Sequence, residues 1–428
     1  MIASVIGKIF LQAYNEKFGL HYSAKEFFIK EYFPLFFGYG TYMQWIINSP
    51  FTSGLRKGKK PTSEECQKKL KVLLDKIENN TPDASFAIGY PALELTATTS
   101  GQVTNMDIRT NQEDVFASWI GSGLGIGIQG GMSILFDDPR VLLAIHEGWR
   151  LYRDFLNTNG HLRGNQINSW NGQWLTHRFS DDYKEYNPGI DFDPLVCAKG
   201  GMEVKVQDWL SVLVAIARKI NIPRMMGYVY SLGQMNTTIG FIPFYLGEIK
   251  APFELYRKFF EVTTDESIAK AWECENGFMV ACQRGAIGLE AMEPKGLKPY
   301  MRGKDPVYDT RAEEKIINFR IKQIWLLAML SDKELWNKAL EVAKLFKAFE
   351  KGAAKGKTDR KNLIGNIMHA DRVVFFDYLG KMIMEDGDSL ASVGAMQLWE
   401  TIIDIPIDKH LYFIVLVRFH YAVLTKQE

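Results

Sequence analysis

The chain has 428 residues, carries a net charge of +1, and is 46% hydrophobic and 13% aromatic. This length accommodates two or three domains of ordinary size, and the apolar content excludes a disordered protein. The balanced charge excludes a protein that coats nucleic acid with its whole surface, but it permits a local basic patch.

The four cysteines, Cys66, Cys197, Cys274 and Cys282, form no CxxC pair. Their irregular spacing argues against a structural zinc site and a disulfide framework. The apolar run 411–417 is too short to cross a bilayer, which needs about 20 residues. The N-terminus lacks the pattern of a signal peptide. We therefore expect a cytoplasmic protein that has no membrane partner, no metal and no cofactor.

The first part of the chain mixes helical and strand-like patterns. Residues 1–50 are rich in aromatic side chains and predict a partly helical segment. Further helices are predicted from apolar periodicity over 63–78, 139–156 and 209–219. Strands are predicted over 115–135, 202–206 and, as a pair around a turn, 227–246. A long loop is predicted over 161–190, where Asn, Gly, Gln and Ser predominate.

The C-terminal part is predicted to be a helical bundle. Residues 294–310 are basic and contain Pro and Gly, so they predict a linker between a mixed α/β body, 1–293, and the bundle, 311–428. The clearest helical pattern places Leu335, Ala339, Val342, Ala343, Phe346 and Phe349 on one face. The predicted fold class is α+β.

A glycine-rich run contains a formal GxGxxG pattern at Gly125, Gly127 and Gly130. A dinucleotide site requires this pattern between a strand and a helix N-terminus, whereas a strand-like segment, 132–136, follows it here. Nucleotide binding is therefore disfavoured. Alternating glycines instead let another element approach the strand backbone closely. That element is either a nucleic-acid strand or a neighbouring helix, and the helix is the favoured alternative.

A second pattern places Asp193 ten residues before the sequence Glu203-Val-Lys205. In Mg²⁺-dependent nucleases such carboxylates hold the metal ion, and the lysine positions or activates the attacking water. A Glu-x-Lys pair on a solvated strand also occurs often by chance. A Mg²⁺-dependent endonuclease is therefore kept as the alternative function.

Amide and aromatic side chains are concentrated between residues 164 and 174. Asn and Gln pair with adenine edges and Trp stacks on bases, so this composition suits recognition of a polynucleotide better than proton transfer. An ordinary polar loop pinned by two tryptophans is the structural alternative. The candidate base-contacting residues, including those of two other polar turns, are Asn165, Gln166, Asn168, Asn171, Gln173, Gln129, Gln234 and Asn236.

Basic residues are concentrated between Lys344 and Lys361, where seven cations stand against Glu350 and Asp359. One such cluster would indicate a solvated face. The predicted linker and an early loop, 54–61, repeat the pattern next to glycines, which favours phosphate binding. The candidate phosphate-binding residues are Lys351, Lys355, Lys357, Arg360, Lys361, Lys295, Lys298 and Arg302.

The segment LWNKALEVAKLFKAFEKGAAKGKTDRKNLIGNIMHA, followed by VVFFDYL at 373–379, resembles the large subunit of type I CRISPR–Cas surveillance complexes (Cascade). The resemblance implies a non-catalytic subunit of a ribonucleoprotein. Its body would contact the guide RNA and read a short protospacer-adjacent motif in double-stranded DNA, and its bundle would hold the opened strands. Specificity would come mainly from guide pairing, and a separate helicase–nuclease would cut.

Overall fold

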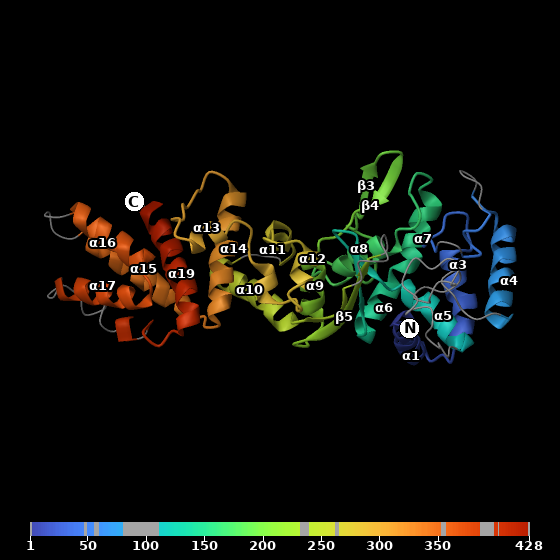
Figure 1. Cartoon of the computed structure of the whole chain (residues 1–428). Coiled ribbons are helices and arrows are strands. Elements are labelled where there is room, and N and C mark those ends of the chain that lie inside the picture. The colour runs from blue at the N-terminus through green and yellow to red at the C-terminus, as the bar shows by residue number, and fades with distance from the viewer. Residues whose placement is uncertain are drawn as a thin grey trace. The chain divides into compact units, whose positions relative to one another are not determined.

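Helices dominate the chain, and the strands of the described residues form two small antiparallel sheets (Figure 1), which confirms the α+β class. The computed structural model describes residues 2–46, 49–54, 60–79, 111–231, 239–261, 265–351, 357–385, 398–400 and 402–426. The chain divides into unit 1, Met1–Phe244 with Cys282–Ala286, and unit 2, Tyr245–Ala281 with Ile287–Glu428. The predicted linker, 294–310, lies inside unit 2.

Unit 1 begins with an aromatic-rich helical segment, as predicted. Its helical elements are α1 (Ile2–Phe18), α2 (Ala24–Phe27), the π-helical turn Phe28–Tyr32, α3 (Phe33–Phe36), α4 (Ser63–Asn79), α5 (Gln112–Ser122), α6 (Pro139–Glu147), α7 (Trp149–Thr158), α8 (Ile167–Arg178) and α9 (Trp209–Lys219). The predictions at 63–78 and 209–219 are confirmed. The helix predicted at 139–156 is interrupted at Gly148, where the indole ring of Trp174 occupies the space of a Cβ.

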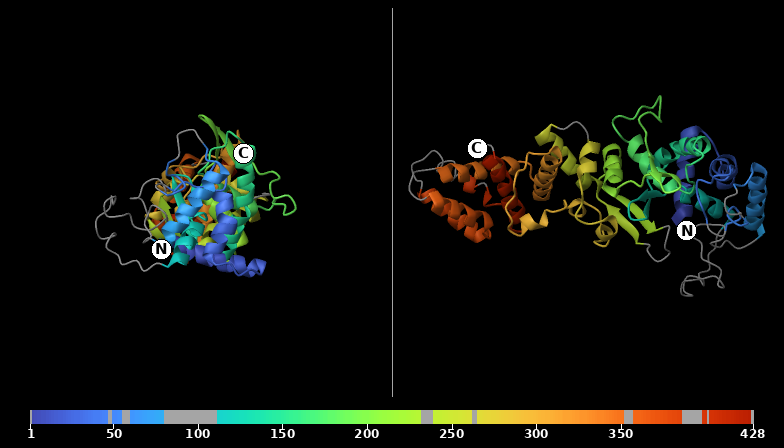
Figure 2. Two further views of the ribbon diagram at one scale, coloured as in Figure 1. Left: turned by 90° about the vertical axis from the view of Figure 1, so that its right-hand side faces the viewer. Right: turned by 90° about the horizontal axis from the view of Figure 1, so that it is seen from above.

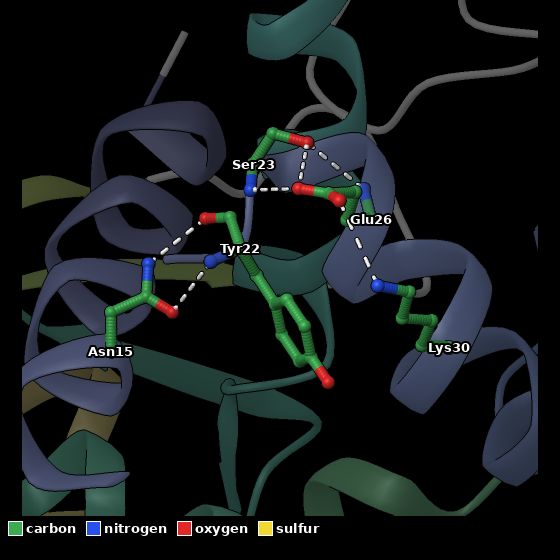
Figure 3. Close-up of polar contacts among 5 residues, drawn as sticks. All are labelled: Asn15, Tyr22, Ser23, Glu26 and Lys30. Atoms are coloured by element: carbon green, nitrogen blue, oxygen red, sulfur yellow. Dashed lines mark hydrogen bonds and ion pairs between the residues drawn. The ribbon is translucent and has the colours of Figure 1, made fainter. Parts of the chain in front are cut away.

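Three side chains set the junction between α1 and α2, as Figure 3 shows. The Asn15 amide bonds in both directions to the backbone of Tyr22, at 2.9 and 3.0 Å. Ser23 and Glu26 then form a capping box, in which each side chain accepts a hydrogen bond from the other residue's backbone N–H. This reciprocal capping satisfies amides that the first turn of α2 leaves without helical partners.

The extended structure predicted from residue 115 is wrong up to Ser122, because these residues form α5. Residues 115–122 are buried on every side, so their apolar pattern lacks the one-sided periodicity that separates helix from strand. Glycine allows α5 to cross α1 closely. A Cβ on Gly121 would meet the carbonyl oxygen of Ala3, and one on Gly7 would meet that of Ala117.

The larger sheet has the order β1-β2-β5-β6, with every neighbouring pair antiparallel. Its strands are β1 (Ile126–Ile128), β2 (Met132–Phe136), β5 (Met225–Ser231) and β6 (Gly240–Phe244). Gly130 and Gly131 form the β1–β2 turn with φ values of 88° and 74°. The GxGxxG pattern therefore lies in a hairpin. The strand prediction at 132–136 and the paired strands within 227–246 are confirmed.

A second hairpin joins β3 (Leu195–Ala198) to β4 (Gly201–Val204). Figure 1 shows it projecting from the rest of unit 1 beside α7 and α8. The predicted strand at 202–206 corresponds to β4, which ends at Val204.

The regular elements of unit 2, over its described residues, are helices. Its helical elements are α10 (Leu246–Phe260), α11 (Asp265–Ala271), α12 (Phe278–Cys282), the 3-10 helix Leu289–Met292, α13 (Lys298–Met301), α14 (Glu313–Leu330), α15 (Leu335–Lys351), α16 (Lys357–His369), α17 (Arg372–Glu385) and α19 (Ile407–Lys426). Helices α15 and α16 pack on each other and on α19, as Figures 1 and 2 show in orange and red. The predicted apolar face of α15 is confirmed, since all six of its residues are buried. None of the helices within the described ranges has the length and hydropathy that a membrane span requires.

Three histidines lie in apolar surroundings within the two units. Burial lowers the pKa of His146 and His410 to about 4 and that of His420 to about 3. The His420 ring contacts Trp336 edge-on, with 4.5 Å between ring centroids. Each imidazole is therefore held in its neutral form at neutral pH.

Because these three histidines are buried in their neutral form, we expect the folded protein to lose stability in mild acid. In the unfolded chain a histidine takes up a proton near pH 6.5, so the full stability is present above that pH and falls as the pH drops toward 4. Each histidine contributes a slope of roughly 1.4 kcal/mol per pH unit within this window. Urea unfolding at several pH values measures the slope. His420→Leu should flatten it, whereas the same change at the exposed His21 should not.

Candidate nucleic-acid interface

The amide-rich segment of unit 1 forms helix α8, so the loop predicted at 161–190 is wrong over Ile167–Arg178. Trp170 and Trp174 lie fully inside the unit. Their indole N–H groups donate to the carbonyl oxygens of Gly148, at 3.0 Å, and Ala144, at 2.7 Å. The two tryptophans anchor α8 through a spacing of four residues, which places both on one helix face.

Asn168 and Asn171 extend from α8 toward β1 and are buried. The Asn171 amide donates to the carbonyl oxygens of Gly123 and Gly125, both at 2.8 Å. The Asn168 amide donates to the Ser133 hydroxyl at 3.0 Å. A Cβ on Gly127 would meet the α8 backbone, so the element that approaches the glycine run is a helix. Both amides therefore serve internal packing, and neither is available to a nucleobase.

The remaining predicted base-contacting residues are dispersed. The Asn165 side-chain oxygen accepts a hydrogen bond from the backbone N–H of Trp45 at 2.6 Å. The Gln166 side-chain oxygen accepts one from the backbone N–H of Val204 at 3.0 Å. Gln173 is half-buried, and Gln129 is exposed at the β1–β2 turn. The last two predicted residues, Gln234 and Asn236, lie outside the described residues.

The pattern predicted for a nuclease lies on the β3–β4 hairpin, but its carboxylates are bound to cations. Asp193 is 85% exposed and lies 3.4 Å from the Lys205 ammonium, and Glu203 forms an ion pair with Arg163. In the parts of the chain that the structure describes, no three His, Cys, Asp or Glu side chains are grouped as metal ligands. Because these carboxylates belong to no such group, we derive no reaction from them.

Two cations of the predicted basic cluster are used within unit 2. The Lys347 ammonium lies 2.9 Å from the Glu350 carboxylate and 4.8 Å from the centre of the Tyr421 ring. Arg360 donates to the carbonyl oxygen of Phe349 at 3.1 Å and stacks over its ring. Lys361 is exposed. The side chains of Lys351, Lys355 and Lys357 lie outside the described part of the structure.

Two of the three candidate cations in the predicted linker also form ion pairs within unit 2. Lys295 pairs with Glu273 at 2.8 Å, and Lys298 pairs with Glu275 at 3.3 Å. Arg302 is exposed. Ion pairs between such exposed groups contribute little stability, so both lysines can exchange their partners for a phosphate.

A groove of about 360 Å³ lies next to the basic cluster, within unit 2. Its walls come from the segment 305–308, helix α16 and helix α19. The groove is lined by Asp305, Pro306, Val307, Tyr308, Lys361, Ile364, Gly365, Met368, Arg418, Tyr421, Ala422, Thr425 and Lys426. Its lining thus combines apolar and aromatic residues with basic side chains.

The groove is lined by more basic than acidic side chains. Its single lining carboxylate, Asp305, is already engaged by Arg418 and by His369, each at 3.2 Å. Lys361 on α16 and Lys426 at the end of α19 are both exposed. The groove therefore presents positive charge on two different helices while its negative charge is compensated internally.

Comparison of the chain with protein-family models, with curated proteins and with solved structures found no match. The residues of the groove are therefore the basis for a functional proposal.

Sequence analysis identified Lys361 but not the α19 side of the groove. The available signal was the spacing of Arg418, Tyr421, Ala422 and Thr425, which places these residues on one helix face. A strand of nucleic acid presents phosphates along one side and apolar base and sugar surface along the other. A groove lined by apolar and basic side chains can accommodate both.

Proposed function

We propose that this chain is a non-catalytic nucleic-acid-binding subunit of an RNA-guided DNA surveillance complex, equivalent to the large subunit of Cascade. The groove of unit 2 would hold one phosphate backbone. The observation that supports this proposal is that exposed Lys361 and Lys426, on separate helices, line one groove together with apolar and aromatic residues. Each of these cations can neutralise one phosphate of a bound strand.

The proposal assigns different tasks to the two units. Unit 1 would contact the guide RNA and read a short protospacer-adjacent motif in double-stranded DNA, as the resemblance implies. Exposed Gln129, at the tip of the β1–β2 hairpin, is the amide best placed for that contact. The other subunits of the complex and a separate helicase–nuclease would supply guide pairing and cleavage, and the assembly would act in the cytoplasm.

The salt dependence of binding tests the groove. We expect Lys361→Ala combined with Lys426→Ala to weaken binding of single-stranded DNA or RNA and to lower the slope of log affinity against log salt by roughly 1.4, about 0.7 for each lost phosphate contact. Fluorescence anisotropy with a labelled oligonucleotide between 50 and 200 mM salt, as is typical for such titrations, provides the measurement.

The matched control is Lys68→Ala with Lys71→Ala on α4, where both side chains are also exposed. It removes the same total charge from unit 1. If the control and the groove variant change the slope equally, the groove is not the binding surface. If the parent protein binds no oligonucleotide, the proposed function itself is wrong.

A further inference from the structure

The β5–β6 half of the larger sheet carries a row of aromatic side chains on one face. Tyr228 and Tyr230 alternate along β5 with rings nearly parallel, at 25° and 5.9 Å between centroids. Phe241 lies opposite Tyr228 on β6, with 5.3 Å between their ring centroids and the two ring planes inclined at 61°. Phe241 is 63% exposed and the Tyr228 ring is partly exposed. A large aromatic side chain is thus held open to solvent on a regular strand.

The other half of this sheet face is covered. Helix α8 lies over β1, and its Asn168 amide reaches the Tyr230 hydroxyl at 3.3 Å. The opposite face of the sheet forms the core of the unit, since Ile134, Val229 and Phe244 are buried there. The aromatic row therefore begins at the edge of α8 and continues across β5 to the exposed ring of Phe241.

A cation precedes the strand that carries the two tyrosines. Strands β5 and β6 contain no acidic residue. Exposed Arg224 immediately precedes β5, and its guanidinium lies 3.7 Å from the Met226 sulfur atom, beside the row. An aromatic surface with a cation at its edge matches a nucleobase joined to a phosphate.

We propose that the exposed ring of Phe241, with Tyr228 beside it, is a stacking platform for an unpaired base of single-stranded nucleic acid, with Arg224 next to its phosphate. This inference rests on the proposed function and names the class of ligand for a second surface, in unit 1. The platform recognises the flat face of a base, which all four bases share, so it binds single strands without selecting a sequence.

The test replaces the rings without removing the apolar surface. Tyr228→Leu combined with Phe241→Leu should weaken binding of a single-stranded oligonucleotide about tenfold or more, as is usual when a stacked base loses its ring. Tyr228→Phe keeps the ring and should bind as the parent does. Thermal unfolding of each variant checks that the sheet is intact. Ultraviolet cross-linking of a bromouracil oligonucleotide to the parent, followed by mass spectrometry, should identify the peptide 225–231 or 239–244.

Each outcome separates this inference from the groove proposal. If the leucine variant binds like the parent while the Lys361 and Lys426 variant does not, the platform is wrong and the groove stands. If the leucine variant loses equal affinity for an abasic oligonucleotide, the rings do not stack on bases, and the platform is wrong again. If the parent binds no single strand at all, the proposed function fails first.

Discussion

Gly121→Ala should destabilise unit 1 by about 3 kcal/mol, the upper range for an added methyl group in a packed interior. The added Cβ would meet the carbonyl oxygen of Ala3, which belongs to the α1 backbone and has no alternative rotamer. Helix α1 would have to move away from α5, and the contact between Gly7 and Ala117 would separate with it. Chemical denaturation followed by tryptophan fluorescence measures the loss.

Gly160→Ala is the matched control in the same unit. No atom lies within 4 Å of the position that its Cβ would occupy, and its φ is not in the left-handed region. Substitution at such a position usually leaves stability unchanged or raises it by roughly 0.4–1 kcal/mol. Equal behaviour of the two variants would show that the α1–α5 crossing is not as close as described.

Arg418→Met should cost unit 2 about 3 kcal/mol and weaken the groove as a binding site. Arg418 is 3% exposed, and its guanidinium donates to the carbonyl oxygens of Tyr300, at 2.9 Å, and Lys304. It also donates to Asp305 at 3.2 Å. Methionine retains the apolar stem but leaves these acceptors without their donor, so the segment that begins the groove wall loses its attachment to α19.

Denaturation and oligonucleotide affinity together test this role. Arg302→Met removes an exposed cation from the same part of the chain and should leave stability within roughly 0.5 kcal/mol of the parent. If Arg418→Met keeps both parental stability and parental affinity, the guanidinium does not hold the wall of the groove.

Local pattern was sufficient where apolar spacing or bounding turn residues mark an element in the sequence. The helix at 63–78 and the buried face of α15 follow from apolar residues at helical spacing. The β2 strand and the paired β5 and β6 strands follow from short apolar segments bounded by turn residues. These elements needed no knowledge of distant partners.

Local pattern failed where the role of a side chain depends on a contact with a residue far along the chain. Asn171 looked suited to a base, yet its amide binds the carbonyl oxygen of Gly123, 48 residues earlier. Lys347 belongs to the predicted basic cluster, yet it lies over the ring of Tyr421 on α19. The groove likewise combines three separate segments. Composition gives the chemistry of such side chains but not which of them the fold uses internally.

The path of the chain between the two units affects the order in which they can fold during synthesis. Residues 1–244 emerge from the ribosome first, but Cys282–Ala286, which completes unit 1, follows only after α10 and α11 of unit 2 have been made. Translation therefore interleaves the two units rather than finishing one before the other begins. A fragment that stops at Phe244 lacks this returning segment, and one that starts at Ile287 lacks α10 and α11. No single cleavage point yields both units complete.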